Sequence, residues 1–368
     1  METPSTGGTL ETVLAALHRD ADAKMGVWFG CALPDEFSDW RAEYGFARES
    51  VALIDKNYRA YLSFTGPDRV RYLNAILTNN IKDLAAGTGT VSLLLNPQGH
   101  ILAEIETYAL TESLFCVSCA MIRARLIEVL DKYIIMDDVT LTDETERYAT
   151  LALEGPKAAA VVREVSGVDI ATLGELSFRD GRASSIPCRV VKRSPGGDPG
   201  AEFVVERDKV AQLWEILLEA VQEHGGGPMG YTALSAMRLS QDIPWFGYDF
   251  GEKQIPHEAG LQDSHISYTK GCYTGQEIVE RVRSRGHANR VRVGLKFSAG
   301  EPLAEAMPLF ADGKEIGFVT RTAFSPSIEG LIGMGYVRRE HSAAGTILEC
   351  GGNKAEVIQL PLLSASSR

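Results

Sequence analysis

The residues of this chain best suited to chemistry lie in the segment Lys270-Gly-Cys-Tyr-Thr-Gly-Gln-Glu277. Thr274 and Glu277 have the spacing of a Ser/Thr-x-x-Glu capping box, so a helix is predicted to begin just after Cys272. Backbone N–H groups and the helix dipole favour negative charge at such a terminus. With Lys270 two residues away, the pattern predicts a reactive, thiolate-rich Cys272 with Lys270 as its activator. The alternative is a structural cysteine, because cysteine is among the most buried residue types.

The predicted helix runs to about Gly286 and begins an arginine-rich stretch of an otherwise acidic chain. Guanidinium groups bind carboxylates and phosphates in a bidentate manner, so the stretch predicts a site for an anionic ligand. A solvated basic face is the alternative, since Glu277 and Arg281 also have the spacing of an ordinary i,i+4 ion pair. The arginines concerned are Arg281, Arg283, Arg285, Arg290 and Arg292.

A long segment rich in loop-forming residues, 240–270, precedes the cysteine. Its Trp245-Phe-Gly-Tyr-Asp249 cluster either covers a core or offers a stacking wall for a flat heterocycle. Glu258 could accept hydrogen bonds from the N–H groups of such a ring. His257 has no partners at metal-ligand spacing, and no second cysteine pair or histidine cluster accompanies Cys116-Val-Ser-Cys119, so no metal site is predicted.

Two stretches of the chain repeat the same order of elements. Tyr61–Asp68 and Thr150–Lys157 each predict a strand, a Gly-Pro turn and a helix with proline at its first position. Leu114–Ser118 and Glu202–Glu206 each predict a strand that leads into a further helix. The equivalent residues of the two stretches stand 88 or 89 positions apart. The sequence therefore predicts two α+β modules of similar build, each containing a β-hairpin.

After residue 290, short strands separated by glycine and proline predict a small antiparallel barrel. Together these patterns predict an α+β fold in three domains. The first α+β module with an N-terminal extension covers residues 1–144, the second module with the cysteine segment covers 145–290, and the C-terminal β-barrel covers 291–368. Two packed modules are expected to leave a cleft between them, which is a preferred place for a ligand.

Composition limits the classes of protein to which the chain can belong. With 368 residues, 45% of them hydrophobic and 23% charged, it is expected to be a globular protein of two or three domains. The formal net charge of −12 argues against direct nucleic-acid binding through overall charge. No apolar run approaches the ~20 residues that span a bilayer, and the polar N-terminus lacks a hydrophobic signal segment. Six cysteines in such a chain do not form a disulfide framework, so a reducing, cytoplasmic location without membrane contact is expected.

The segment Lys270–Glu277 resembles the signature of the YgfZ family of folate-binding proteins. These proteins share a superfamily with the glycine-cleavage T-protein, an aminomethyltransferase. Weaker resemblances extend over nearly the whole chain, through Phe64–Asp68, Leu77-Thr-Asn-Asn-Ile81 and Arg238–Pro244. The last of these is similar to an Arg-x-Glu-x-Gly-x-Pro stretch of the superfamily. The resemblance implies a three-domain cloverleaf around a central site for tetrahydrofolate or a derivative.

Two positions differ from the T-protein pattern. T-proteins carry an Asp-Asp pair after a Gly-Gly hairpin, one of which is catalytic, and Ala103 and Glu104 stand there in this chain. The superfamily glutamate associated with the pterin ring falls at Ser240. T-proteins also lack the cysteine signature, so these differences favour the YgfZ-like interpretation over aminomethyl transfer. Pro256–Leu261 is closer to the T-protein, so Glu258 could take over a pterin contact.

The main hypothesis from the resemblance is a folate-binding accessory protein that supports iron–sulfur cluster assembly or repair, including that of enzymes that modify tRNA. Its partners would be iron–sulfur client or assembly proteins. One thiolate cannot hold a cluster, so a contact of Cys272 with iron or sulfur would be transient or shared. The alternatives are a folate-dependent aminomethyltransferase-type enzyme and a structural interaction module with a vestigial site. The residues expected to hold folate are Arg238, Tyr248, Glu258, Tyr273, Gln276, Glu277, Arg281 and Arg285.

Overall fold

The computed structural model describes residues 9–194, 196, 197, 199–298 and 300–362. By its internal contacts the chain divides into two compact units. Unit one comprises Met1–Leu62, Val117–Arg125 and Asp143–Leu234, and unit two comprises Ser63–Cys116, Leu126–Thr142 and Ser235–Arg368. None of the helices in the described part of the chain has the length and apolar composition that a membrane crossing requires.

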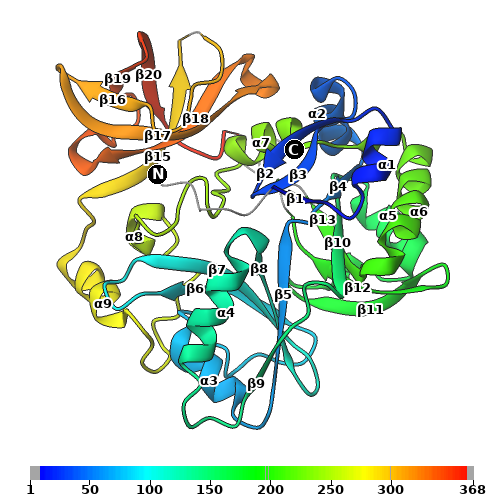
Figure 1. The fold of residues 1–368 in the computed structure, drawn as a ribbon. Helices are drawn as coiled ribbons and strands as arrows, with labels where there is room; N and C mark the ends of the chain where they lie inside the picture. The colour runs from blue at the N-terminus through cyan, green and yellow to red at the C-terminus, as the bar shows by residue number, and fades with distance from the viewer. Residues whose placement is uncertain (1–8, 195, 198, 299, 363–368) are drawn as a thin grey trace. The chain divides into compact units, whose positions relative to one another are not determined.

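A six-stranded sheet with the order β11-β12-β13-β10-β4-β14 forms the framework of unit one. Helices α5 (Ala158–Ser166) and α6 (Val210–Glu223) cover it, and their apolar residues share one core with those of the strands (Figure 1). The strands are β4 (Ala52–Asp55), β10 (Tyr148–Glu154), β11 (Phe178–Ala183), β12 (Ile186–Lys192), β13 (Gly200–Glu206) and β14 (Gly227–Pro228). The N-terminal elements of the unit are β1 (Leu10–Glu11), α1 (Ala15–Asp20), β2 (Lys24–Trp28), β3 (Cys31–Glu36) and α2 (Trp40–Glu49).

A five-stranded sheet with the order β6-β7-β8-β5-β9 repeats part of this topology. The strands are β5 (Arg59–Thr65), β6 (Gly89–Leu95), β7 (Ile101–Ala109), β8 (Leu114–Cys119) and β9 (Thr140–Asp143), and the helices are α3 (Arg69–Ile76) and α4 (Arg123–Lys132). The order β6-β7-β8-β5 matches β11-β12-β13-β10 strand for strand, so the predicted internal repeat is confirmed. One detail of the prediction is wrong, because Pro67 and Pro156 each stand two residues before the first helical residue.

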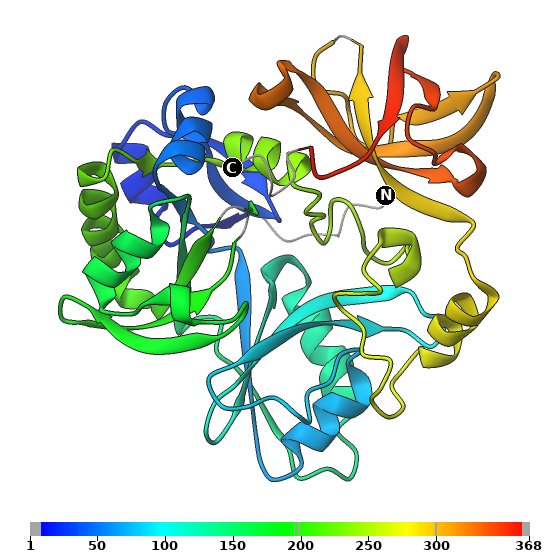
Figure 2. The ribbon, with the colours of Figure 1, turned by 180° about the vertical axis from the view of Figure 1, so that it is seen from behind.

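The C-terminal part of unit two is a closed barrel of six antiparallel strands, in the order β15-β18-β17-β16-β19-β20 (Figure 1, Figure 2). Alternate apolar residues such as Leu295, Val319 and Leu348 fill its interior. The strands are β15 (Arg290–Phe297), β16 (Pro308–Ala311), β17 (Lys314–Ser325), β18 (Gly330–Arg338), β19 (Ile347–Cys350) and β20 (Asn353–Ile358). The α+β class and the barrel are confirmed; the last strand, β20, was not predicted.

The segment with the cysteine leads into helix α9 (Gln276–Arg285), which begins differently from the prediction. The capping box is absent, since the N-cap is Gly275 with φ +83° and no side chain caps the helix. A Cβ atom on Gly275 would lie 2.7 Å from the Asn96 carbonyl oxygen, and one on Gly99 would lie 2.8 Å from Ile278 Cγ2. The two glycines therefore allow α9 to approach the β6–β7 turn closely. The helix ends at Gly286 in the left-handed conformation, as predicted.

The turn after α3 fastens a later loop of the chain to strand β6. Thr78 Oγ1 accepts a hydrogen bond from the Leu93 N–H at 2.8 Å and donates one to the His265 carbonyl oxygen at 2.6 Å. Asn79 Nδ2 donates to the carbonyl oxygens of Val91, at 3.0 Å, and Ser264, at 3.3 Å. Buried backbone groups need such partners, so this turn fixes residues 264 and 265 against the sheet.

Lys270 closes the C-terminus of α3. Its Nζ donates to the carbonyl oxygens of Asn74, Leu77 and Asn79 at 2.5, 2.5 and 3.0 Å. An ammonium group has three donors, so all of them are used by main-chain carbonyls. A cation is also favoured at this end of a helix, where the carbonyls are unpaired. Burial lowers the pKa of Lys270 to about 8.

A buried ion pair joins helix α7 (Tyr231–Ser240) to the barrel. Arg238 and Asp249 are both 0% exposed and pair through Nη1 and Oδ2. The carboxylate also accepts hydrogen bonds from the backbone N–H of Trp245 at 2.9 Å and from the Thr320 hydroxyl of β17 at 2.6 Å. Burial lowers the pKa of Arg238, and the charge of Asp249 opposes that shift. A buried charge is tolerated only when it is paired in this way.

Replacing Lys270 with methionine leaves three main-chain carbonyls without their donor. We expect a local loss of stability of about 2–4 kcal/mol, because each buried acceptor keeps its desolvation cost. Hydrogen–deuterium exchange of peptides that cover residues 74–81 should become faster, while peptides from β18 stay protected. Lys253→Met, at an exposed lysine of the same unit, is the control. Equal exchange in the two variants would show that Lys270 does not hold the turn.

Replacing Asp249 with asparagine leaves the buried Arg238 charge uncompensated. We expect the free energy of unfolding of unit two to fall by about 3–5 kcal/mol. Asp242→Asn is a matched control, because Asp242 also pairs with an arginine but its side chain is 36% exposed. Its φ of +60° also suits asparagine. Urea unfolding followed by tryptophan fluorescence measures both changes, and similar losses would contradict the role given to the buried pair.

Candidate functional site

The carboxylate of Glu104 on strand β7 lies beside the imidazole of His265 in unit two. Glu104 Oε1 lies 2.9 Å from His265 Nε2, and His265 Nδ1 lies 2.7 Å from Ser264 Oγ. The Glu104 side chain is 26% exposed and that of His265 is 10% exposed. Along β7, buried Ala103 and Ile105 point to the face opposite Glu104. A partly exposed carboxylate beside a histidine can exchange a proton with a bound ligand.

Sequence reasoning singled out Glu104 only as a replacement within the T-protein pattern, and it missed His265. The two residues stand 161 positions apart. A histidine in a loop carries no local pattern that predicts its partner. The resemblance of Leu77–Ile81 to the superfamily pattern is a signal for this part of the site, because Thr78 of that turn binds the backbone of His265.

Two residues of unit two, Arg238 and Tyr336, have buried polar atoms that lack hydrogen-bond partners in the described part of the chain. Among the residues that the structure describes, Arg238 Nε and Nη2 and Tyr336 Oη are buried and have no hydrogen-bond partner. The Trp245 ring stacks on the guanidinium, 4.5 Å from its centre. Nε and Nη2 form the edge with which arginine binds a carboxylate or a carbonyl oxygen. Because these atoms are buried, a ligand reaches them only if a neighbouring side chain moves.

Tyr248 and Glu258 lie in the long segment that follows α7, as predicted, but both already have neighbours. The Arg321 guanidinium lies 4.9 Å from the centre of the Tyr248 ring. Glu258 accepts the Ile255 N–H at 3.3 Å and thereby caps the short helix α8 (Pro256–Ala259). Its other oxygen lies 3.5 Å from Arg290 Nε. The structure thus gives Glu258 a capping role in addition to the predicted contact with a ring.

The cysteine segment contains both exposed and buried residues. Cys272 is exposed, whereas the other five cysteines are buried. Tyr273 is 6% exposed, and burial raises its pKa. Gln276 and Glu277 form the first turn of α9, with Glu277 exposed. The three ammonium donors of Lys270 bind main-chain carbonyls, and the activation of Cys272 by Lys270 stays a prediction.

The arginines of this region do not form one free cluster. Arg281 is exposed, and Arg283 stacks 4.1 Å from the centre of the Tyr268 ring. Arg292 donates to the Ala259 carbonyl at 2.8 Å and pairs with Asp242 at 2.5 Å. Arg285 ends α9, but its side chain is outside what the structure describes. Arg283, Arg290 and Arg292 therefore contact neighbouring side chains or loops, and Arg281 is exposed.

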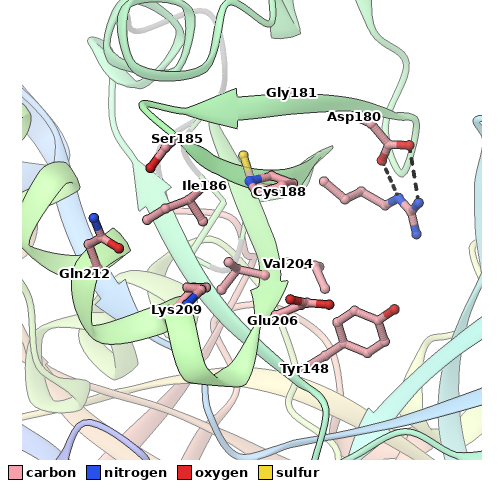
Figure 3. A pocket seen from close by; sticks show the side chains of 13 residues that line it. Tyr148, Asp180, Gly181, Ser185, Ile186, Cys188, Val204, Glu206, Lys209 and Gln212 are labelled. Atoms are coloured by element: carbon pink, nitrogen blue, oxygen red, sulfur yellow. Dashed lines mark hydrogen bonds and ion pairs between the residues drawn. The ribbon is translucent and has the colours of Figure 1, made fainter.

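Unit one has a pocket of about 520 Å³ beside strands β11, β12 and β13 (Figure 3). Its four charged side chains each pair with a neighbour: Asp180 with Arg189, Glu206 with Arg147, and Lys209 with Asp208. Burial raises the pKa of Cys188 in its wall to about 11. None of the site residues predicted from the sequence lines this pocket. In the described part of the chain, no three His, Cys, Asp or Glu side chains are placed to hold a metal ion.

Comparison with known proteins gives a consistent result along the chain. Residues 14–265 match the GCVT N-terminal domain, and residues 290–363 match the glycine cleavage T-protein C-terminal barrel domain. A protein of Streptomyces avermitilis named aminomethyltransferase is 26% identical over 345 residues, which is 93% of each chain. A Symbiobacterium thermophilum protein of the same name is 28% identical over 369 residues, 97% of this chain and 98% of its own.

The fold also matches a solved structure. The crystal structure of glycine cleavage system aminomethyltransferase T from Bartonella henselae superposes with a TM-score of 0.87. It covers 96% of this chain and 98% of its own at 24% sequence identity, which establishes a shared fold.

These findings contradict the main functional hypothesis, an accessory protein for iron–sulfur clusters. The relatives that match nearly the whole chain are named aminomethyltransferases, and neither iron–sulfur assembly nor tRNA modification is supported. The hypothesis depended mainly on the eight residues Lys270–Glu277. At least two of them have a structural role: Lys270 closes α3, and Gly275 lets α9 approach the β6–β7 turn. Membership of the YgfZ family in particular is not confirmed. The chain belongs to the GCVT family of the glycine-cleavage T-protein, with both its N-terminal domain and its C-terminal barrel.

Proposed function

We propose that this protein is a tetrahydrofolate-dependent, aminomethyltransferase-type enzyme. The observation that carries the proposal is the Glu104 carboxylate, which is 26% exposed and hydrogen-bonded to His265. It stands where the T-protein pattern has its acidic pair. The names of the relatives that match over 90% of the chain support the same type of reaction. We infer no activity from the resemblance of Lys270–Glu277 to YgfZ proteins.

The proposed reaction moves the carbon of a donor X–CH₂–NH₂. Tetrahydrofolate, when bound, supplies two amine nitrogens that take up this carbon. The C–X and C–N bonds of the donor break, two new C–N bonds form, and the two displaced N–H protons end on ammonia and X–H. Ammonia is a poor leaving group unless its nitrogen is protonated. In this proposal Glu104 carries a proton to or from that nitrogen, as a general acid–base group.

The residues around Arg238 fit folate chemically. Folate carries carbonyl and carboxylate oxygens, and Arg238 Nε and Nη2 and Tyr336 Oη are donors without an acceptor among the described residues. Trp245 and Tyr248 offer aromatic faces beside them, with ring centres 6.1 Å apart. We propose that this group holds folate. The predicted contributions of Glu258, Tyr273, Gln276, Glu277, Arg281 and Arg285 remain proposals of the same kind.

Folate binding is tested by titrating tetrahydrofolate into the full-length protein in a calorimeter. Tyr336→Phe removes one unpaired donor with little change in shape, and we expect binding to weaken about 5- to 10-fold. Tyr133→Phe, the same change in a loop of unit two, should bind like the wild type. No binding by the wild type at high micromolar concentrations would exclude the proposal.

The reaction is tested in the reverse direction, with 5,10-methylenetetrahydrofolate, ammonium and a small dithiol as X–H. Glu104→Gln keeps the shape of the side chain but cannot exchange a proton, so we expect kcat to fall about 10²- to 10⁴-fold. Cys272→Ala should leave turnover unchanged, because the mechanism does not use the thiol. Turnover that survives Glu104→Gln and is lost in Cys272→Ala would contradict the assignment.

A further inference from the structure

We propose that His265 is a positioning residue for Glu104 and that Ser264, His265 and Glu104 form a hydrogen-bonded relay. The relay aims the carboxylate at the amino nitrogen of the one-carbon donor. This inference rests on the proposed function for its substrate, but the relay itself is a property of the protein alone. It adds two residues to the site that neither the sequence pattern nor the comparisons identify.

The direction of the relay follows from the carboxylate, which when ionised only accepts hydrogen bonds. His265 Nε2 lies 2.9 Å from Glu104 Oε1, and His265 Nδ1 lies 2.7 Å from Ser264 Oγ. When Nε2 carries the proton and donates to the carboxylate, neutral Nδ1 accepts a hydrogen bond from the Ser264 hydroxyl. One tautomer of the imidazole is thereby selected by its two partners, as in other histidines whose second nitrogen is hydrogen-bonded.

The backbone of His265 is fixed from both sides. Its N–H donates to the Leu261 carbonyl at 3.0 Å, and its carbonyl accepts the Thr78 hydroxyl at 2.6 Å. The Thr78 oxygen in turn accepts the N–H of Leu93. Leu93 is the residue of β6 directly opposite Glu104 on β7. The imidazole and the carboxylate are therefore both tied to one pair of strands, which holds their relative position more rigidly than a flexible loop would.

Exposure also suits this division of roles. The His265 side chain is 10% exposed, while that of Glu104 is 26% exposed. The carboxylate is thus the more accessible member of the pair. A surface pair in unit one, His224 with Glu164, has the same 2.9 Å separation, but its side chains are 28% and 51% exposed. It offers a chemically matched control outside the proposed site.

The kinetic test uses the reverse assay described above. We expect His265→Ala to lower kcat by up to about 10²-fold, because the carboxylate loses its fixed orientation. The KM for the folate should change little, since His265 does not touch the folate in this scheme. His265→Gln keeps an N–H donor on a side chain of similar length, so it should recover part of kcat. His224→Ala should behave as the wild type.

A second test does not depend on turnover. In protein labelled with ¹⁵N-histidine, nuclear magnetic resonance should show His265 as the Nε2–H tautomer. The signal should shift in Glu104→Gln and in Ser264→Ala, whereas His224→Ala should leave it unchanged. A ring that interconverts between tautomers in the wild type, or a kcat that is unaffected by His265→Ala, overturns the relay. If the tautomer is fixed and responds to both variants but the wild type shows no turnover, the relay stands and the proposed function fails.

Discussion

The short turn after α3 is the constraint on which the proposed site of unit two depends. Thr78 and Asn79 bond both to strand β6 and to residues 264 and 265, and Lys270 binds the carbonyls of the same turn. Backbone groups that leave a helix and do not enter a strand must find other partners when they are buried. Here those partners come from a loop almost two hundred residues later. The same hydrogen bonds thus satisfy the backbone groups of the turn and place His265 beside Glu104.

Half-buried Lys270 and fully buried Arg238, both in unit two, differ in whether all of their hydrogen-bond donors have acceptors. Lys270 has three donors and three carbonyl acceptors, so all of its donors are used within the fold. Arg238 has an ion partner in Asp249 but keeps two nitrogens, Nε and Nη2, without an acceptor among the described residues. Unsatisfied buried donors carry a desolvation cost that folding alone does not recover. This difference is why we assign ligand binding to the surroundings of Arg238 rather than to Lys270.

The regular elements of the fold could be predicted because their signals are local. Short apolar runs in β6 and β7, barrel strands bounded by glycine and proline, and the Gly-Pro turns before α3 and α5 are visible in short windows of sequence. The predicted start of helix α9 is wrong in one respect. Thr274 and Glu277 have the spacing of a capping box, but they do not form one. A glycine with φ +83° occupies the N-cap instead, and close packing on the β6–β7 turn requires it. Spacing alone does not reveal such a tertiary contact.

The site itself was harder to predict, because its chemistry comes from residues that are ordinary on their own. The glycines and the lysine next to Cys272 predict a reactive thiol; in the structure the lysine binds carbonyls and the thiol is exposed. Glu104 stands in place of an aspartate of the T-protein pattern. Its longer side chain still carries a carboxylate, which lies 2.9 Å from His265 Nε2. The longer reach means that the carboxylate needs an additional support to hold one orientation, since glutamate has one more rotatable bond than aspartate. A histidine fixed by the Thr78 turn supplies such a support, so the change from aspartate to glutamate and the presence of His265 are consistent with each other.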